Sequence, residues 1–158
     1  MARSFPYDIY RGVIILAPSD WDSGAIPSPE HRRQGFFPQD RAIELYTPHA
    51  DDTVRVTVSV TDDYPTPAAD ALRAIRAPIE VGDDLMLCNI DNEDDLPIRD
   101  IPPGRYGLQF ELRPGGEHDG KAFYYDIALT FVRDADPPFE ILKSGHEGMT
   151  ATEVLRRD

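Results

Sequence analysis

The sequence predicts an all-β fold, a single-domain antiparallel β-sandwich with one or two short helices. Three observations lead to this prediction: apolar and polar residues alternate strictly in three segments, turn residues recur between them, and 15 of 158 residues are proline. A period of two is typical of a strand with one buried face. Frequent proline discourages long helices, and Pro-Gly clusters end strands. Strands of this kind pack as two sheets around one core.

Three segments show the clearest pattern of a strand. Valines at 54, 56, 58 and 60 alternate with polar residues over Val54–Val60, and the same period governs Tyr106–Leu112 and Phe123–Phe131. Turn clusters such as Pro102-Pro103-Gly104 separate these runs. Further strands are expected over Tyr7–Ala17 (broken near Gly12), Arg41–Tyr46, Ala74–Val81, Leu85–Ile90 and Phe139–Leu142.

Helix is scarce in this sequence. One short helix is expected over Pro27–Gln34, because Ser28 is a good N-cap and Pro29 suits the first helical position. A second helical turn fits Pro67–Leu72.

The length of 158 residues suits one domain, which at this size buries about 68–70% of its unfolded surface. Apolar patterning fades after Leu142, so we expect a sandwich over residues 1–142 and a C-terminal tail or short helix over residues 143–158. The single cysteine, Cys88, lies in an apolar run and is expected to behave as a small hydrophobe.

The strongest compositional signal is acidity. The chain has 29 Asp and Glu against 16 Lys and Arg, a formal net charge of −13. Many carboxylates bunch beside turn residues: Asp51-Asp52, Asp62-Asp63, Asp83-Asp84 and the run from Asp91 to Asp95. Such loops repel nucleic acid and attract cations or a basic protein partner, although net charge often serves solubility alone. We therefore expect no direct nucleic-acid binding.

No targeting or membrane segment is expected. The apolar run Val13–Ala17 is too short for a signal peptide or a membrane span, and no basic region precedes it. These features favour a cytoplasmic protein without membrane contact.

No pattern of residues indicates an enzyme or a cofactor. The four histidines are widely separated, and no nucleophile elbow, zinc-ligand spacing or phosphate-binding loop is present. Glu117-His118-Asp119 places an imidazole between carboxylates, but it lies in a Gly-rich hairpin where solvation explains it. An enzyme that uses these three residues is the weakest alternative.

A calcium- or ligand-binding β-sandwich without catalytic activity is the alternative to a protein-binding function. Asp91, Glu93 and Asp95 alternate as the ligands of a calcium loop do, but Leu96 stands where an EF-hand needs glycine. Loop pairs such as Asp62-Asp63 offer similar ligands.

The single tryptophan, Trp21, is flanked by Asp20 and Asp22. A partly exposed ring among carboxylates can anchor a partner's Arg or Lys; a slightly favoured alternative is that Trp21 closes one end of the sandwich. Together with the acidic loops, this gives the candidate partner-binding residues Asp20, Trp21, Asp22, Asp62, Asp63, Asp91, Glu93, Asp94 and Asp95.

Several short strings occur in an order that resembles a known family. They are Asp20-Trp21-Asp22, Gln34-Gly35-Phe36 followed by Ala42-Ile43-Glu44-Leu45, Arg76-Ala77-Pro78-Ile79-Glu80-Val81, and Ile101-Pro102-Pro103-Gly104-Arg105-Tyr106-Gly107-Leu108. This ordered set, over about residues 5–132, resembles the competence protein J family, the DNA-entry nuclease inhibitors of bacteria. The segment from Asp134 lies beyond the matched part, and Asp22 replaces the hydroxyl residue expected after the tryptophan.

The resemblance implies a small protein that binds a bacterial DNA-degrading enzyme and blocks it, or an immunity protein that neutralises a toxin nuclease. Acidity is in keeping with this, because a nuclease presents cationic groups to phosphate and carboxylates can cover them. The expected partner is a basic protein, a nuclease or nuclease toxin.

Overall fold

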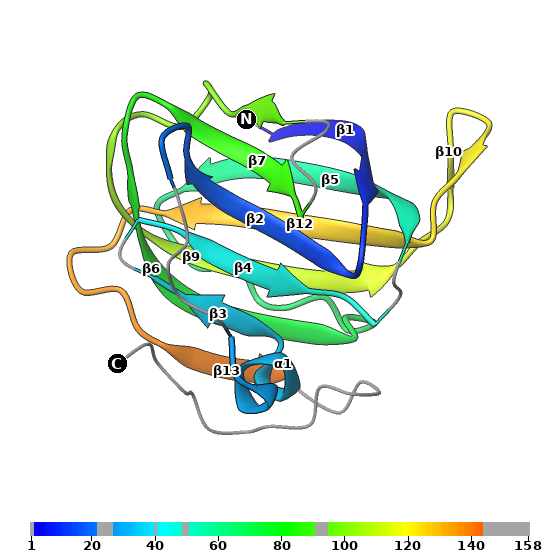
Figure 1. Ribbon diagram of the computed structural model, residues 1–158, viewed down its shortest axis with the longest axis horizontal. Coiled ribbons are helices and arrows are strands. Elements are labelled where there is room, and N and C mark those ends of the chain that lie inside the picture. The colour runs from blue at the N-terminus through cyan, green and yellow to red at the C-terminus, as the bar shows by residue number, and fades with distance from the viewer. Residues whose placement is uncertain (1, 22–26, 40, 49–50, 91–94, 144–158) are drawn as a thin grey trace.

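The computed structural model describes residues 2–21, 27–39, 41–48, 51–90 and 95–143. Two sheets pack face to face (Figure 1). The larger sheet has the order β1 (Ala2–Ile9), β5 (Asp52–Thr61), β12 (Tyr125–Val132), β9 (Gly104–Pro114), β6 (Arg73–Val81) and β13 (Glu140–Lys143). The smaller has the order β3 (Phe36–Pro38), β4 (Ile43–Tyr46), β2 (Val13–Pro18), β7 (Leu85–Asn89) and β8 (Leu96–Pro97). The all-β fold class is confirmed.

A separate hairpin of β10 (Glu117–His118) and β11 (Lys121–Ala122) extends from one end of the sandwich (Figure 1). It links β9 to β12, which pair from Tyr125 opposite Pro114 to Val132 opposite Gly107.

The core lies between the sheets and contains the faces that alternation predicted. Val54, Val56 and Val58 of β5 are at most 2% exposed, and Leu108, Phe110 and Leu112 of β9 and Ile127, Leu129 and Phe131 of β12 are as deeply buried. They share one cluster with residues of the smaller sheet, among them Ile14, Leu16, Leu45 and Leu87.

One strand pair differs from the antiparallel arrangement expected. β12 pairs antiparallel with β9 but parallel with β5, with Ile127 opposite Val56. Alternation defines the face that a strand buries and leaves its direction undetermined, because either direction presents the same face to the core. The parallel pair requires a long connection, and the chain between β5 and β12 contains β6 to β11, which include strands of both sheets.

The expected break near Gly12 is confirmed. Arg11 and Gly12 have positive φ values of 56° and 68°, so the chain turns sharply between β1 and β2. Because β1 belongs to the larger sheet and β2 to the smaller, this turn moves the chain from one layer to the other.

The helix α1 (Pro29–Gln34) begins as the sequence predicted. Ser28 accepts a hydrogen bond from the His31 N–H, and His31 Nδ1 accepts from the Ser28 N–H in return. Gly35 ends the helix in the left-handed region, at φ 92°. The segment Pro67–Leu72 holds a single turn, closed by a hydrogen bond from Ala71 to Ala68, and no helix.

The sequence analysis missed β3, β8, β10, β11 and the first half of β1. Each is very short or contains a proline, as with Pro6, Pro38 and Pro97. β1, β3 and β8 are edge strands, where a missing N–H costs no hydrogen bond within the sheet.

The larger sheet also buries side chains on its outer face. Gln109 and Glu111 of β9 are 0% exposed, although alternation directs them away from the core. The chain between β5 and β6 crosses this face, and Tyr64 packs so closely on Gly107 that a Cβ there would lie 1.9 Å from its Oη.

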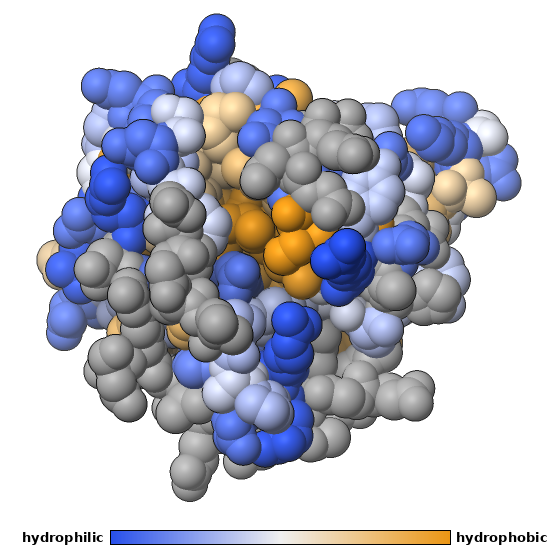
Figure 2. Space-filling model, in the orientation of Figure 1, coloured by the Kyte–Doolittle hydropathy of each residue, from blue (hydrophilic) through white to orange (hydrophobic). Residues whose placement is uncertain are grey.

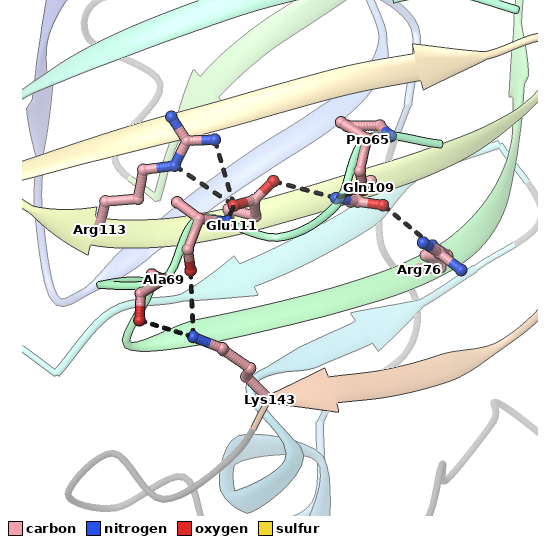
Figure 3. Close-up of polar contacts among 8 residues, drawn as sticks. Pro65, Ala69, Arg76, Gln109, Glu111, Arg113 and Lys143 are labelled. Atoms are coloured by element: carbon pink, nitrogen blue, oxygen red, sulfur yellow. Dashed lines mark hydrogen bonds and ion pairs between the residues drawn. The ribbon is translucent and has the colours of Figure 1, made fainter. Parts of the chain in front are cut away.

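Hydrogen bonds hold the crossing segment in place (Figure 3). Glu111 accepts from the Ala68 N–H at 2.9 Å, from Gln109 Nε2 at 3.0 Å and from Arg113 Nη2 at 3.1 Å. Gln109 Nε2 also donates to the Pro65 carbonyl. Glu111 is thus a buried carboxylate with several donors, one of them charged.

On the opposite side of this network, Arg76 Nε donates to Gln109 Oε1 at 2.9 Å, and Lys143 Nζ donates to the Ala68 and Ala69 carbonyls at 3.0 Å (Figure 3). Arg76 also lies over the Tyr64 ring at 4.3 Å.

Phe110→Ala should lower the free energy of unfolding by about 3–5 kcal/mol, because it leaves a cavity in the core. Urea denaturation followed by circular dichroism measures this loss. Tyr124→Ala is the control, since Tyr124 is 48% exposed and its truncation should change stability by less than about 1 kcal/mol. Equal losses in the two variants would contradict the assigned core.

Candidate partner-binding face

The outer face of the smaller sheet is apolar. Every residue of β2 is buried, and while Ile14 and Leu16 point into the core, Val13, Ile15 and Ala17 point outward. They form a second cluster, hereafter the outer face, with Phe37, Ala42, Tyr46 and Cys88 and with the partly buried Trp21, Met86 and Ile90. Figure 2 shows hydrophobic side chains gathered in a hollow at the middle of this face.

A glutamate lies within this apolar surface. Glu44 of β4 is 7% exposed, and its partners across the two neighbouring strands are Ile15 of β2 and Phe37 of β3. Alternation along β4 places it on the side away from Ile43 and Leu45, which belong to the core.

Tyr46 Oη donates a hydrogen bond to Glu44 Oε2 at 3.0 Å. Burial raises the pKa of Glu44, and the Tyr46 hydrogen bond and the charge of Arg32 oppose this rise. Burial, together with the nearby Glu44 carboxylate, also raises the pKa of Tyr46. The Arg32 guanidinium lies over the Tyr46 ring at 5.1 Å.

Trp21 lies at the margin of the outer face. Its backbone N–H donates to the Pro18 carbonyl at 3.0 Å, so the chain turns directly after β2, and its ring packs against the outer cluster while remaining partly exposed. The adjacent Asp20 is exposed and lies 3.9 Å from Arg41, a long and solvent-screened ion pair.

Asp95, the residue directly before β8, borders the same face. Burial raises the pKa of the Cys88 thiol to about 12, and the charge and hydrogen bond of Asp95 contribute to this rise. Asp95 is therefore next to a residue of the outer cluster, and Cys88 is buried among apolar side chains, as expected of a cysteine that acts as a small hydrophobe.

Asp62 and Asp63 belong to the other sheet. They follow β5, are exposed, and Asp62 pairs with Arg133 at 3.0 Å. The structure thus brings Asp20, Trp21 and Asp95 to one face and leaves Asp62 and Asp63 apart from it. The other candidates, Asp22, Asp91, Glu93 and Asp94, lie outside the described residues.

The alternatives from the sequence have little support in the described geometry. His118 Nε2 lies 3.2 Å from Asp126 Oδ2, and no hydrogen bond joins it to Glu117 or Asp119. Among the described residues, no group of three or more His, Cys, Asp or Glu could hold a metal ion. The proposed calcium loop itself lies mostly outside those residues. No helix in the described part of the chain is long and apolar enough to span a membrane.

One protein-family model matches this chain over most of its length. The family model of competence protein J (ComJ) matches residues 10–132. The chain belongs to the competence protein J family. The resemblance noted in the sequence is thereby confirmed, over nearly the span that the ordered strings cover.

Two solved structures share the ComJ-type fold. One is the crystal structure of ComJ from Bacillus subtilis, an inhibitor of the DNA-degrading activity of NucA; its TM-score is 0.62 at 17% identity, and the match covers 84% of this chain and 99% of that chain. The other is the crocagin biosynthetic gene J product, with a TM-score of 0.50 at 15% identity, covering 84% and 98%. No curated protein matches the sequence significantly.

Glu44 did not appear among the candidates from sequence. In the string Ala42-Ile43-Glu44-Leu45 it looks like an ordinary solvent-facing residue of a strand. The available signal is the uninterrupted apolar run Val13–Ala17, because a strand that is apolar at every position is buried on both faces. A glutamate on the neighbouring strand then faces apolar side chains.

Glu44→Gln should stabilise the protein at neutral pH. A raised pKa means that the folded state favours the neutral carboxyl, so the wild type loses stability as pH rises above about 4.5, the ordinary pKa of this group. The amide keeps a carbonyl acceptor for Tyr46 and carries no charge. In thermal melts from pH 4 to pH 8, the melting temperature of the variant should increase relative to that of the wild type as pH rises.

Glu80→Gln on β6 is the matched control, because Glu80 is exposed. A variant at Glu44 that is less stable than the wild type at pH 7 would show that the buried carboxylate is stabilising.

Proposed function

We propose that this protein inhibits a bacterial DNA-degrading nuclease by binding it. The observation that carries the proposal is membership of the competence protein J family, together with a fold that matches nearly the whole length of a NucA inhibitor. An immunity protein against a toxin nuclease would act by the same chemistry, in the cytoplasm of the producing cell.

The charge of the chain supports this function. A nuclease must present cationic groups to the phosphates of DNA, and a protein with a net charge of −13 is attracted to such a surface. Exposed carboxylates at Asp20 and Asp95 border an apolar face whose partly exposed members are Trp21, Met86 and Ile90, and stable interfaces combine such apolar side chains with a charged rim. The inhibitor would then cover the cationic DNA-binding site of the nuclease.

We propose that inhibition needs no catalysis by this chain. His118→Ala should leave inhibition unchanged, because His118 lies on the β10–β11 hairpin and pairs with Asp126 alone among the described carboxylates. Titration into a plasmid-degradation assay compares the variant with the wild type. Loss of inhibition by a variant with a native circular dichroism spectrum would contradict the proposal.

The direct test adds the purified protein to a NucA-like nuclease from the same genome and to Bacillus subtilis NucA. Plasmid cleavage should stop near stoichiometric addition, and the two proteins should co-elute in gel filtration. Undiminished cleavage with separate elution from both nucleases would overturn the proposed function.

Two matched pairs of substitutions separate the effect of net charge on association from the effect of where the carboxylates lie. Asp20→Asn with Asp95→Asn removes two carboxylates at the outer face; Asp62→Asn with Asp63→Asn removes two on the other sheet. Stopped-flow association with the nuclease should slow by about tenfold in the first pair and much less in the second. The rate should also fall with added salt, because exposed charges are screened. Equal slowing in both pairs would indicate that net charge, and not the outer face, guides association.

A further inference from the structure

Two buried glutamates of this protein differ in how their charge is compensated. Glu111, on the outer face of the larger sheet, is 0% exposed and accepts hydrogen bonds from a backbone amide, Gln109 and Arg113. Glu44, on the outer face of the smaller sheet, is 7% exposed, and Tyr46 is its hydrogen-bond donor among the described residues. Glu111 is compensated within the chain, whereas Glu44 has one neutral donor in the part of the chain that the structure describes.

No described lysine or arginine forms an ion pair with Glu44. The charge of Arg32 lowers the pKa of Glu44, but the Arg32 guanidinium packs on the Tyr46 ring. A buried carboxylate with a single neutral donor is costly, because it has lost its hydration without gaining equivalent partners. Stability alone would favour an amide or an apolar residue at this position.

The environment of Glu44 fits a basic side chain from another molecule. Its carboxylate is already desolvated between Ile15 and Phe37, so an arriving cation meets an acceptor that has little water left to lose. The ring of Tyr46 is adjacent, and Trp21 packs on the same cluster. Arginine suits this setting, because its planar guanidinium pairs with a carboxylate and stacks on aromatic rings.

We propose that Glu44 and the surrounding outer face form the docking site for an arginine of the nuclease, carried on an apolar segment. This inference rests on the proposed function and names the surface and the residue type through which it acts. An arginine that contacts DNA phosphate when the nuclease binds its substrate would pair with Glu44 in the complex with the inhibitor. It would then no longer be available to bind DNA.

Charge complementarity selects this occupant over a second copy of the chain. Two copies joined through the outer face would bring two Glu44 carboxylates together, each in a protein with a net charge of −13. Like charges at a desolvated contact are strongly unfavourable.

The test measures the dissociation constant of the nuclease complex and the thermal stability of the free inhibitor for each variant. Glu44→Gln should weaken binding by at least about 30-fold, mainly through faster dissociation, while the free protein becomes more stable at pH 7. Trp21→Ala should also speed dissociation, by about 30-fold if the ring is an anchor. A gain in stability with a loss of affinity is the signature of a binding residue, since a residue that only supports the fold lowers both.

Two glutamates serve as controls. Glu80→Gln, exposed on β6, should change neither quantity. Glu111→Gln should destabilise the protein, since Arg113 loses its ion-pair partner, yet leave affinity within about threefold of the wild type.

The outcomes separate the inference from the function on which it rests. If the wild type inhibits the nuclease and Glu44→Gln binds as tightly, the docking site is wrong and the proposed function stands. If the wild type neither binds nor inhibits any nuclease tested, both are wrong. If the free protein dimerises and Glu44→Gln tightens the dimer, the outer face is a contact between copies and the inference is overturned.

Discussion

Both sheets of this sandwich bury side chains on their outer faces as well as in the core, and this constraint sets the environment of three buried polar side chains, Gln109, Glu111 and Glu44. A sandwich with two solvated outer faces would leave Gln109, Glu111 and Glu44 in water. Here all three are at most 7% exposed. Each buried polar group then needs partners, because desolvation without hydrogen bonds is costly.

The two faces meet this need differently. On the larger sheet, the chain between β5 and β6 crosses β9, and its backbone and neighbouring side chains give Glu111 a set of donors (Figure 3). On the smaller sheet, apolar side chains surround Glu44, and Tyr46 is the donor within the described chain. Within the described chain, the Glu111 carboxylate has several donors, whereas the Glu44 carboxylate has one and can accept further hydrogen bonds from a partner. We infer that the smaller sheet is where the molecule meets its partner.

The sequence predicted the inner faces well and the outer faces poorly. Alternation over Val54–Val60 identified a strand and the side it buries, because a period of two is a property of the segment itself. The parallel pairing of β5 with β12 and the crossing segment were not predictable in this way, since both depend on contacts between residues far apart in sequence. Family resemblance came from ordered strings that mostly form the framework, and therefore gave the fold and no binding residue.

The structure brings together only some of the candidate residues chosen from the sequence. Trp21, Asp20 and Asp95 were chosen for exposure and charge, and the structure places them around one face. Asp62 and Asp63 were chosen for the same reasons and lie on the other sheet, because loop composition carries no information about which loops meet in space. Glu44 was missed because burial of an outward-pointing glutamate depends on side chains from β2 and β3.

The most direct test of this account is oxidative footprinting, which compares the oxidation rates of side chains in the free protein and in its complex with the nuclease. Trp21 and Met86 are partly exposed on the outer face, and Tyr124 is exposed elsewhere, on the segment that leads into β12. The account predicts that oxidation of Trp21 and Met86 slows in the complex while oxidation of Tyr124 is unchanged. Unchanged oxidation of Trp21 and Met86 in a saturated, inhibited complex would contradict it.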